Sequence, residues 1–171
     1  MIIGNKVILR PVQKEDTQEF NKWRNNLDIK ANALMHPFPV IFEQEIDWFQ
    51  NLCADKMNRT IFFTICDLNQ KVIGYTQLNN INWINKTCYF GIVIGSVDSK
   101  NKGYGKETLT LITDYAFNTL NLNKILLEVI DSNAIAIKLY ETCGFVMEGV
   151  LKNQIFQYNK YYDVRIYSKF K

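Results

Sequence analysis

The chain has 171 residues, of which 47% are hydrophobic and 22% are charged, and its formal net charge is +3. This length predicts a single domain over residues 1–171, large enough to bury a core without a structural metal or disulfide. The small positive charge argues against a protein that coats nucleic acid, so no nucleic-acid partner is expected.

The N-terminal sequence "MIIGNKVILRPV" has no basic segment followed by a long apolar run. It therefore does not resemble a signal peptide. No other stretch of the sequence is apolar over the length of a membrane span. These features predict a cytoplasmic protein with no membrane partner.

The cysteine and histidine content gives little support for metal or triad chemistry. Four cysteines are scattered along the chain without a CxxC pair, at Cys53, Cys66, Cys88 and Cys143. They are interpreted as small buried hydrophobic residues. His36 is the single histidine, so no metal site is predicted.

The first third of the chain predicts one strand and two helices around a proline-containing loop: strand Val7–Val12, helix Lys14–Asn26, loop Leu27–Ile41 and helix Phe42–Lys56. Asp16 is the expected N-cap of the first helix, and Glu19 three residues later fits a capping box. In the second helix, apolar residues recur at helical spacing and indicate one buried face.

The rest of the chain predicts six strands and two helices. The strands are Arg59–Cys66, Lys71–Leu78, Thr87–Gly95, Lys124–Ile130, Phe145–Lys152 and Tyr161–Phe170. The helices are Lys106–Asn118 and Asn133–Cys143, the latter stopped by Gly144. This order of strands and helices indicates an α/β fold with a mixed sheet.

The stretch "SKNKGYGKET" joins a predicted strand to a predicted helix. Free N–H groups at a helix start bind anions, and Gly103 and Gly105 allow a phosphate to approach the main chain. Lys100, Lys102 and Lys106 add positive charge. The bend matches neither the P-loop nor the dinucleotide fingerprint, and a solvated turn with surface lysines is the alternative.

Three elements together resemble the GNAT superfamily of acetyl-CoA-dependent N-acetyltransferases. They are Lys100-x-x-Gly103-x-Gly105, then Asn133-x-x-Ala136-x-x-x-Tyr140, then Gly144-Phe145. Lysine replaces the glutamine or arginine usual at the first position of the loop. The resemblance implies a mixed, mostly antiparallel sheet of six to seven strands, splayed between strands 4 and 5 and flanked by about four helices.

The resemblance also implies acetyl-CoA as co-substrate, with no metal. It places the coenzyme pyrophosphate on the loop that contains Lys100 and on the amides of residues 102–106, which include Tyr104. It places the pantetheine arm against the main chain of Ile92, Val93 and Ile94. Asn133 and Ala136 complete the predicted coenzyme site, although Asn133 also fits a helix cap.

For catalysis, the resemblance assigns Tyr140 as the general acid that protonates the leaving thiolate. Glu128 lies twelve residues earlier, at the spacing of the base in the ribosomal-protein acetylating members. Gln77 and Thr76 are polar alternatives that would hold a water molecule. The oxyanion is expected to meet a main-chain N–H of the Ile92–Ile94 strand.

The acceptor is expected to be a small-molecule primary amine. Residues 29–42, expected to line its site, contain no acidic residue, which disfavours polyamines. The predicted acceptor-binding residues are aromatic or uncharged, apart from one arginine and one histidine: Trp23, Arg24, His36, Phe38, Gln77, Trp83 and Tyr89.

Resemblance to enzymes that acetylate nucleotide-linked amino sugars ranks an amino sugar first. A protein N-terminus ranks second and spermidine third. An acetyl-CoA-binding sensor without turnover is the alternative outside the enzymes. The exposed strand edges of this fold often pair, so a homodimer is a further expectation.

Overall fold

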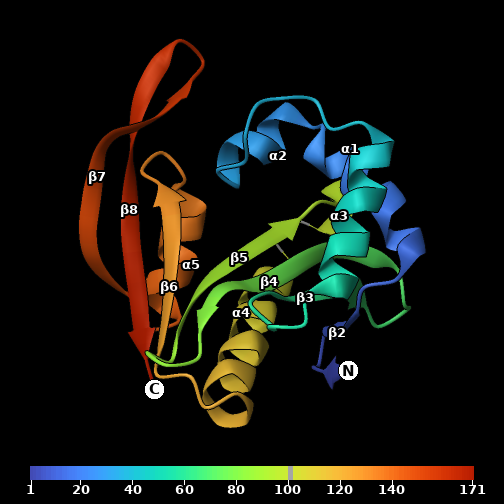
Figure 1. The fold of residues 1–171 in the computed structure, drawn as a ribbon. Helices are drawn as coiled ribbons and strands as arrows, with labels where there is room; N and C mark the ends of the chain where they lie inside the picture. Colours follow the sequence, from blue (N-terminus) through green and yellow to red (C-terminus); the bar gives the residue numbers. More distant parts are fainter. Residues whose placement is uncertain (100–101) are drawn as a thin grey trace.

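The computed structural model of the chain describes residues 1–99 and 102–171. They form an eight-stranded sheet in the order β1-β2-β3-β4-β5-β6-β8-β7 (Figure 1). The strands are β1 (Ile2–Ile3), β2 (Val7–Pro11), β3 (Ile61–Asp67), β4 (Val72–Asn82), β5 (Thr87–Ile94), β6 (Lys124–Ile130), β7 (Val146–Gln157) and β8 (Lys160–Phe170). The predicted mixed, mostly antiparallel sheet is confirmed, and the short β1 is one strand more than predicted.

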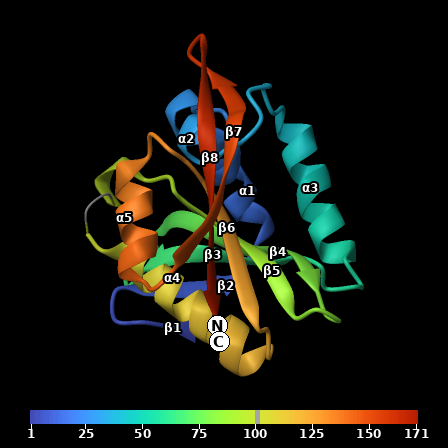
Figure 2. The same ribbon diagram turned by 90° about the vertical axis from the view of Figure 1, so that its left-hand side faces the viewer.

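Within the described residues, five α-helices flank the sheet: α1 (Thr17–Arg24), α2 (Leu27–Asn32), α3 (Phe42–Ala54), α4 (Tyr104–Asp114) and α5 (Ala134–Thr142). A π-helical turn at Tyr115–Thr119 extends α4. Helices α4 and α5 lie on one face, and α1 and α3 lie on the other (Figures 1 and 2). The segment predicted as a loop contains α2, because the Asn26 side chain accepts the Ile29 N–H and caps a short helix.

Each face of the sheet has its own hydrophobic core. The larger one lies beneath α4 and α5 and includes the fully buried Leu109, Ile112 and Ile125. The smaller one lies beneath α1 and α3 and is aromatic, with Phe20 and Trp23 at its centre. The sheet is therefore buried on both sides, and the two faces can contribute different groups to a site at the strand ends.

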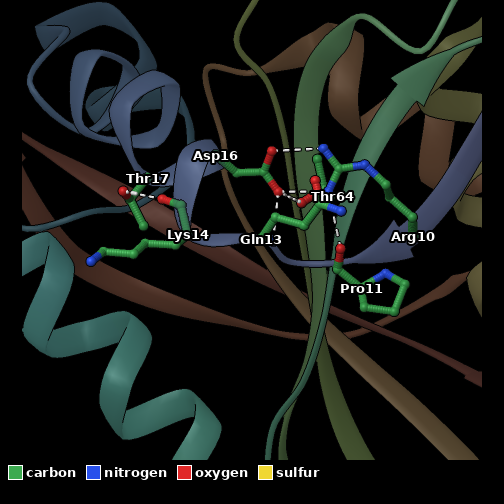
Figure 3. Close-up of polar contacts among 7 residues, drawn as sticks. All are labelled: Arg10, Pro11, Gln13, Lys14, Asp16, Thr17 and Thr64. Atoms are coloured by element: carbon green, nitrogen blue, oxygen red, sulfur yellow. Dashed lines mark hydrogen bonds and ion pairs between the residues drawn. The ribbon is translucent and has the colours of Figure 1, made fainter.

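Asp16 connects the start of α1 to the sheet through an ion pair and hydrogen bonds (Figure 3). Its carboxylate is 2.7 Å from both Arg10 Nη atoms, and it accepts the Gln13 N–H and the Thr64 hydroxyl. It makes no side-chain cap to α1, and Glu19 forms an exposed ion pair. The expected capping box is therefore wrong: the arginine offers the carboxylate stronger, charge-assisted hydrogen bonds.

The predicted splay between the fourth and fifth predicted strands, β5 and β6, is present. These strands are the only parallel neighbours in the described sheet, and only three residue pairs join them: Thr87–Lys124, Cys88–Ile125 and Tyr89–Leu126. After these three pairs the ladder ends, and the two strands diverge, as Figure 1 shows. The gap between them opens toward their carboxyl ends.

Residues 1–99 and 102–171 contain neither a membrane-spanning helix nor a cluster of metal-binding side chains. No helix there is long and apolar enough to cross a membrane. No cluster of three or more histidine, cysteine, aspartate or glutamate side chains is placed to hold a metal ion.

We predict that Asp16→Asn lowers the free energy of unfolding by about 2–3 kcal/mol at neutral pH, because it leaves Arg10 without its carboxylate partner. Burial alone would raise the Asp16 pKa, but hydrogen bonds from Arg10, Gln13 and Thr64 lower it below the ordinary 3.8. The stabilisation is therefore present above that value and is lost as pH falls through the lower folded-state pKa.

Urea unfolding of both proteins at neutral pH and near pH 3 checks this prediction. The difference between wild type and variant is expected to shrink at the acidic pH. An equal difference at both pH values would show that the Asp16 charge makes no contribution. Thr64→Val, which removes one neutral donor to the same carboxylate, is the milder companion variant.

Candidate active site

The glycine bend forms the start of α4. Gly103 has a φ of +82°, a left-handed conformation that suits glycine, and its carbonyl accepts the first intrahelical bond, from Glu107 N–H at 3.1 Å. The N–H groups of Tyr104, Gly105 and Lys106 precede that bond and are free for a ligand. Free N–H groups at a helix start are the arrangement that binds anions in proteins, so the bend can serve as the predicted phosphate site.

A distant segment of the chain supports this helix start. The Glu107 carboxylate accepts the main-chain N–H groups of residues 5–7 at 2.7–2.8 Å. The Lys6 ammonium donates to the Lys102 carbonyl at 3.1 Å and so adds a positive charge beside the glycine bend. No pattern in the sequence indicates this contact, because about a hundred residues separate the two lysines. Lys100, predicted to bind the coenzyme, lies outside the described residues.

The β5 main chain faces the gap at alternate residues. Gly95 N–H donates to the Ile73 carbonyl of the β4 side at 3.0 Å. Because an antiparallel ladder alternates, the N–H and C=O groups of Ile92 and Ile94 point away from β4, into the gap. Those of Val93 face β4. The gap therefore offers main-chain donors and acceptors along one edge, where β6 has moved away.

Helix α5 brings a tyrosine to the same region. The Asn133 side chain accepts the Ala136 N–H at 3.1 Å and caps the helix. Tyr140 is 8% exposed, and its ring lies edge-on to Phe90 of β5, with 6.4 Å between ring centroids. Burial raises the pKa of Tyr140 to about 12. Its hydroxyl is thus a protonated donor, and it makes no hydrogen bond to another described residue.

Glu128 lies exposed on β6. It shares a sheet face with Leu126, which pairs with Tyr89, and alternation puts Gln77 of β4 on that face too. Thr76 points to the opposite face, is fully buried, and donates its hydroxyl to a β5 carbonyl at 2.9 Å. Of the two residues predicted to hold water, Gln77 is thus the one on the Glu128 face.

A cavity of about 730 Å³ lies between β4, β5 and the helices α1–α3. Arg24, His36, Phe38 and Gln77, all predicted acceptor residues, line it. Lys30 also lines it and donates to the Phe38 carbonyl. The described lining has three side chains able to carry positive charge and no aspartate or glutamate.

Arg24 is held in this cavity by its neighbours. Its guanidinium lies 4.2 Å from the centroid of the Trp48 ring, and Nη1 is 3.1 Å from Glu45 Oε1. Glu45 is fully buried. Burial raises the pKa of Glu45 above its ordinary value, although Arg24 acts in the opposite direction. The stacked guanidinium therefore keeps a fixed orientation at the cavity wall.

Three predicted acceptor residues do not line the cavity. Trp23 packs in the aromatic core, and Tyr89 lies on β5 near its junction with β6. Trp83 lies at the β4–β5 turn, and its indole donates to the Met57 carbonyl in the loop between α3 and β3. Tyr75, which the sequence analysis does not single out, lines it instead. Tyr75 and Gln77 are two residues apart on β4 and therefore share a sheet face, and this spacing could have identified Tyr75 from the sequence.

Comparisons with known proteins agree with this geometry. The family model described as an acetyltransferase (GNAT) domain matches residues 6–146. The spermidine N(1)-acetyltransferase of Vibrio cholerae is 31% identical over 95% of this chain and 92% of its own length. The acetyltransferase PseH of Campylobacter jejuni strain 81-176 is 29% identical over 74% of both chains.

A solved structure extends the likeness to three dimensions. The crystal structure of the Vibrio cholerae spermidine N-acetyltransferase, in complex with CoA and spermine, has a TM-score of 0.91 to this chain. It is 29% identical and covers 98% of this chain and 96% of the other. The likeness therefore includes both ends of the chain, beyond the segment that the family model matches.

We predict losses of different size for alanine substitutions at two glycines of the site. A Cβ at Gly95 would overlap the buried Trp23 indole, so Gly95→Ala is expected to cost more than about 2 kcal/mol of unfolding free energy. A Cβ at Gly91 meets only the flexible Gln77 side chain, at 3.1 Å, so Gly91→Ala is expected to cost less than about 1 kcal/mol. Urea unfolding measures both. Equal losses would contradict the described packing.

Proposed function

The chain belongs to the GNAT acetyltransferase family and is an N-acetyltransferase that uses acetyl-CoA, and on that premise we propose that it acetylates a small primary amine by direct attack on the thioester. The observation that carries the proposal is the gap between β5 and β6, with Tyr140 beside it. In this proposal the α4 amides hold the pyrophosphate, and Ile92 and Ile94 pair with the pantetheine amides.

Two groups stabilise the charges that develop during the transfer. The thioester oxygen becomes an oxyanion and accepts a main-chain N–H from the β5 edge that faces the gap. The departing thiolate takes the Tyr140 proton. That hydroxyl suits the role because it is protonated at neutral pH and no described residue occupies it. Asn133 holds the start of α5, and so the placement of Tyr140, by capping the helix.

The amine must lose a proton before it attacks, and Glu128 takes that proton in our proposal. Its exposed position on β6 lets it act directly or through a water molecule held by Gln77. Thr76 has no part in this step, since its hydroxyl is fully buried and donates to the main chain.

For the acceptor, the cavity charge favours an amine that carries an anionic group, such as a nucleotide-linked amino sugar. Arg24 offers N–H donors to a phosphate, and the rings of Trp48 and Phe38 offer surfaces for a sugar or a base. A polyamine carries several positive charges, and its site is expected to contain carboxylates, which the described lining does not.

Spermidine is the second candidate, and the comparisons support it more strongly than the amino sugar. The Vibrio cholerae relative is a spermidine acetyltransferase similar over nearly the whole chain. For this candidate, Glu128 on β6 and the buried Glu45 on α3 are two of the acidic groups on the cavity side of the sheet. A protein N-terminus has no specific support from the geometry.

We predict that Tyr140→Phe lowers kcat about a hundredfold, because the leaving thiolate loses its proton donor. The dissociation constant for coenzyme A is expected to stay within about twofold, since the ring is retained. With a Tyr140 pKa of about 12, the defect is expected to have the same size from about pH 6 to pH 10. Steady-state kinetics and calorimetry measure these quantities, and an unchanged kcat would remove Tyr140 as the acid.

An acceptor screen with acetyl-CoA separates the candidates. It compares UDP- and dTDP-linked amino sugars, spermidine and a peptide with a free N-terminus, following thiol release and identifying the product by mass. We predict the highest kcat/KM for a nucleotide-linked amino sugar. Product from spermidine alone would overturn that ranking, and binding of acetyl-CoA without release under any amine would indicate a sensor.

Phe38→Glu adds the missing carboxylate to the cavity, at a side chain that is 71% exposed and so tolerant of change. We predict that it lowers kcat/KM for the nucleotide-linked sugar about tenfold and raises that for spermidine. Phe38→Gln is the matched neutral control and should lack the increase. Equal changes in both variants would show that cavity charge does not select the acceptor.

A further inference from the structure

Helix α2 buries a lysine. Lys30 is the one buried residue of this short helix, with 4% of its surface exposed, whereas Leu27 on the same helix is 65% exposed. A helix ordinarily turns its apolar residues inward, and lysine is almost never fully buried without a partner of opposite charge. A cationic residue on the inner side of α2 therefore needs a physical reason.

Lys30 lacks the counterion that the other buried charges have. Two further charged side chains are buried among the described residues, and both have a partner. Asp16 pairs with Arg10 at 2.7 Å, and Glu45 pairs with Arg24 at 3.1 Å. Lys30 forms no ion pair with any of the described residues. Because a buried charge is costly unless it is paired, the charge of Lys30 is unbalanced in the protein alone.

The ammonium of Lys30 donates to the loop of residues 33–41, which joins α2 to α3. It donates to the Phe38 carbonyl and lies 3.5 Å from the Pro37 carbonyl. An ammonium has three donors, so at least one remains for another acceptor. The end of the loop is held separately, since the Asn25 side chain bonds both the N–H and the carbonyl of Val40, at 2.9 and 2.8 Å. Holding the loop therefore does not by itself require a charge at residue 30.

Lys30 also lies in the wall of the acceptor cavity. Arg24 and His36 share this wall, and its described lining contains no aspartate or glutamate. A charge attracts an opposite charge more strongly in a cavity of low polarity than it does in water. The counterion that the folded chain does not provide is therefore expected to arrive with the ligand.

We propose that Lys30 determines acceptor specificity by pairing with a phosphoryl oxygen of a glycosyl diphosphate, which supplies the counterion of the buried ammonium. This inference rests on the proposed function, in which the acceptor is a nucleotide-linked amino sugar. Lys30 recognises the diphosphate and not the reacting amine, so it takes no part in the proton transfers. A polyamine offers no anion and leaves the charge of Lys30 unbalanced.

Steady-state kinetics with two acceptors test this inference. One is a UDP-linked amino sugar, and the other is the methyl glycoside of the same amino sugar, which lacks the diphosphate. We expect Lys30→Gln to raise KM for the UDP-linked sugar about tenfold and to leave kcat within about twofold, because a charge-assisted contact to the bound acceptor is lost. The value of kcat/KM for the methyl glycoside should stay within about twofold.

Lys30→Met separates the charge from the contact with the loop. Glutamine keeps a donor for the Phe38 carbonyl and methionine does not, so similar rises in KM in both variants support a role of the charge. A loss of kcat/KM for both acceptors alike would assign Lys30 to holding the loop and overturn the inference. Melting temperatures show whether the variants fold, and Lys30→Gln with the two acceptors gives the answer if Lys30→Met does not.

Lys71→Gln is the matched control, because it removes the same charge at the exposed β3–β4 turn. It should keep the wild-type KM for both acceptors. An unchanged KM in Lys30→Gln, with the UDP-linked sugar still acetylated, overturns the inference and leaves the proposed function intact. If the wild-type protein acetylates no nucleotide-linked sugar, the proposed acceptor fails, and this inference fails with it.

Discussion

The early end of the pairing between β5 and β6 is the constraint on which the site depends. After three residue pairs the two strands separate, and the β5 edge keeps main-chain groups that no neighbouring strand satisfies. Leaving such a group unpaired away from water costs about 1–3 kcal/mol. In the proposed function, the amides of the pantetheine arm pair with these groups and remove that cost.

The gap also connects two faces with different contents. The α4 and α5 face provides the free main-chain N–H groups at the start of α4 and the side chain of Tyr140. The α1 and α3 face provides the cavity with Arg24, and Glu128 lies on the same side of the sheet. In the proposed function, coenzyme and acceptor therefore approach from opposite sides, and the amine attacks the thioester at the opening between the two strands.

Sequence alone predicted the strands, α4 and α5 well, because their alternation, helical spacing and glycine stops are local signals. It missed α2, whose six residues are too short for periodicity and depend on the Asn26 cap. Within the candidate site, Gly103 and Gly105 lie at the start of α4 and Tyr140 lies on α5, as their motifs predict, while their roles stay predictions. Local signals do not tell whether Trp23 or Tyr75 faces the cavity, because that depends on how α1 packs on the sheet. Nor do they predict the hydrogen bonds from the N-terminal turn to Glu107, because about a hundred residues separate the two.

The most direct measurement is a crystal structure of the protein with a non-hydrolysable thioether analogue of acetyl-CoA. The pantetheine amides should lie within about 3.2 Å of main-chain groups of Ile92 and Ile94, with the Tyr140 hydroxyl about 3.5 Å from the analogue's sulfur. A coenzyme bound outside the β5–β6 gap, or a sulfur beyond the reach of Tyr140, would contradict the role of the strand separation.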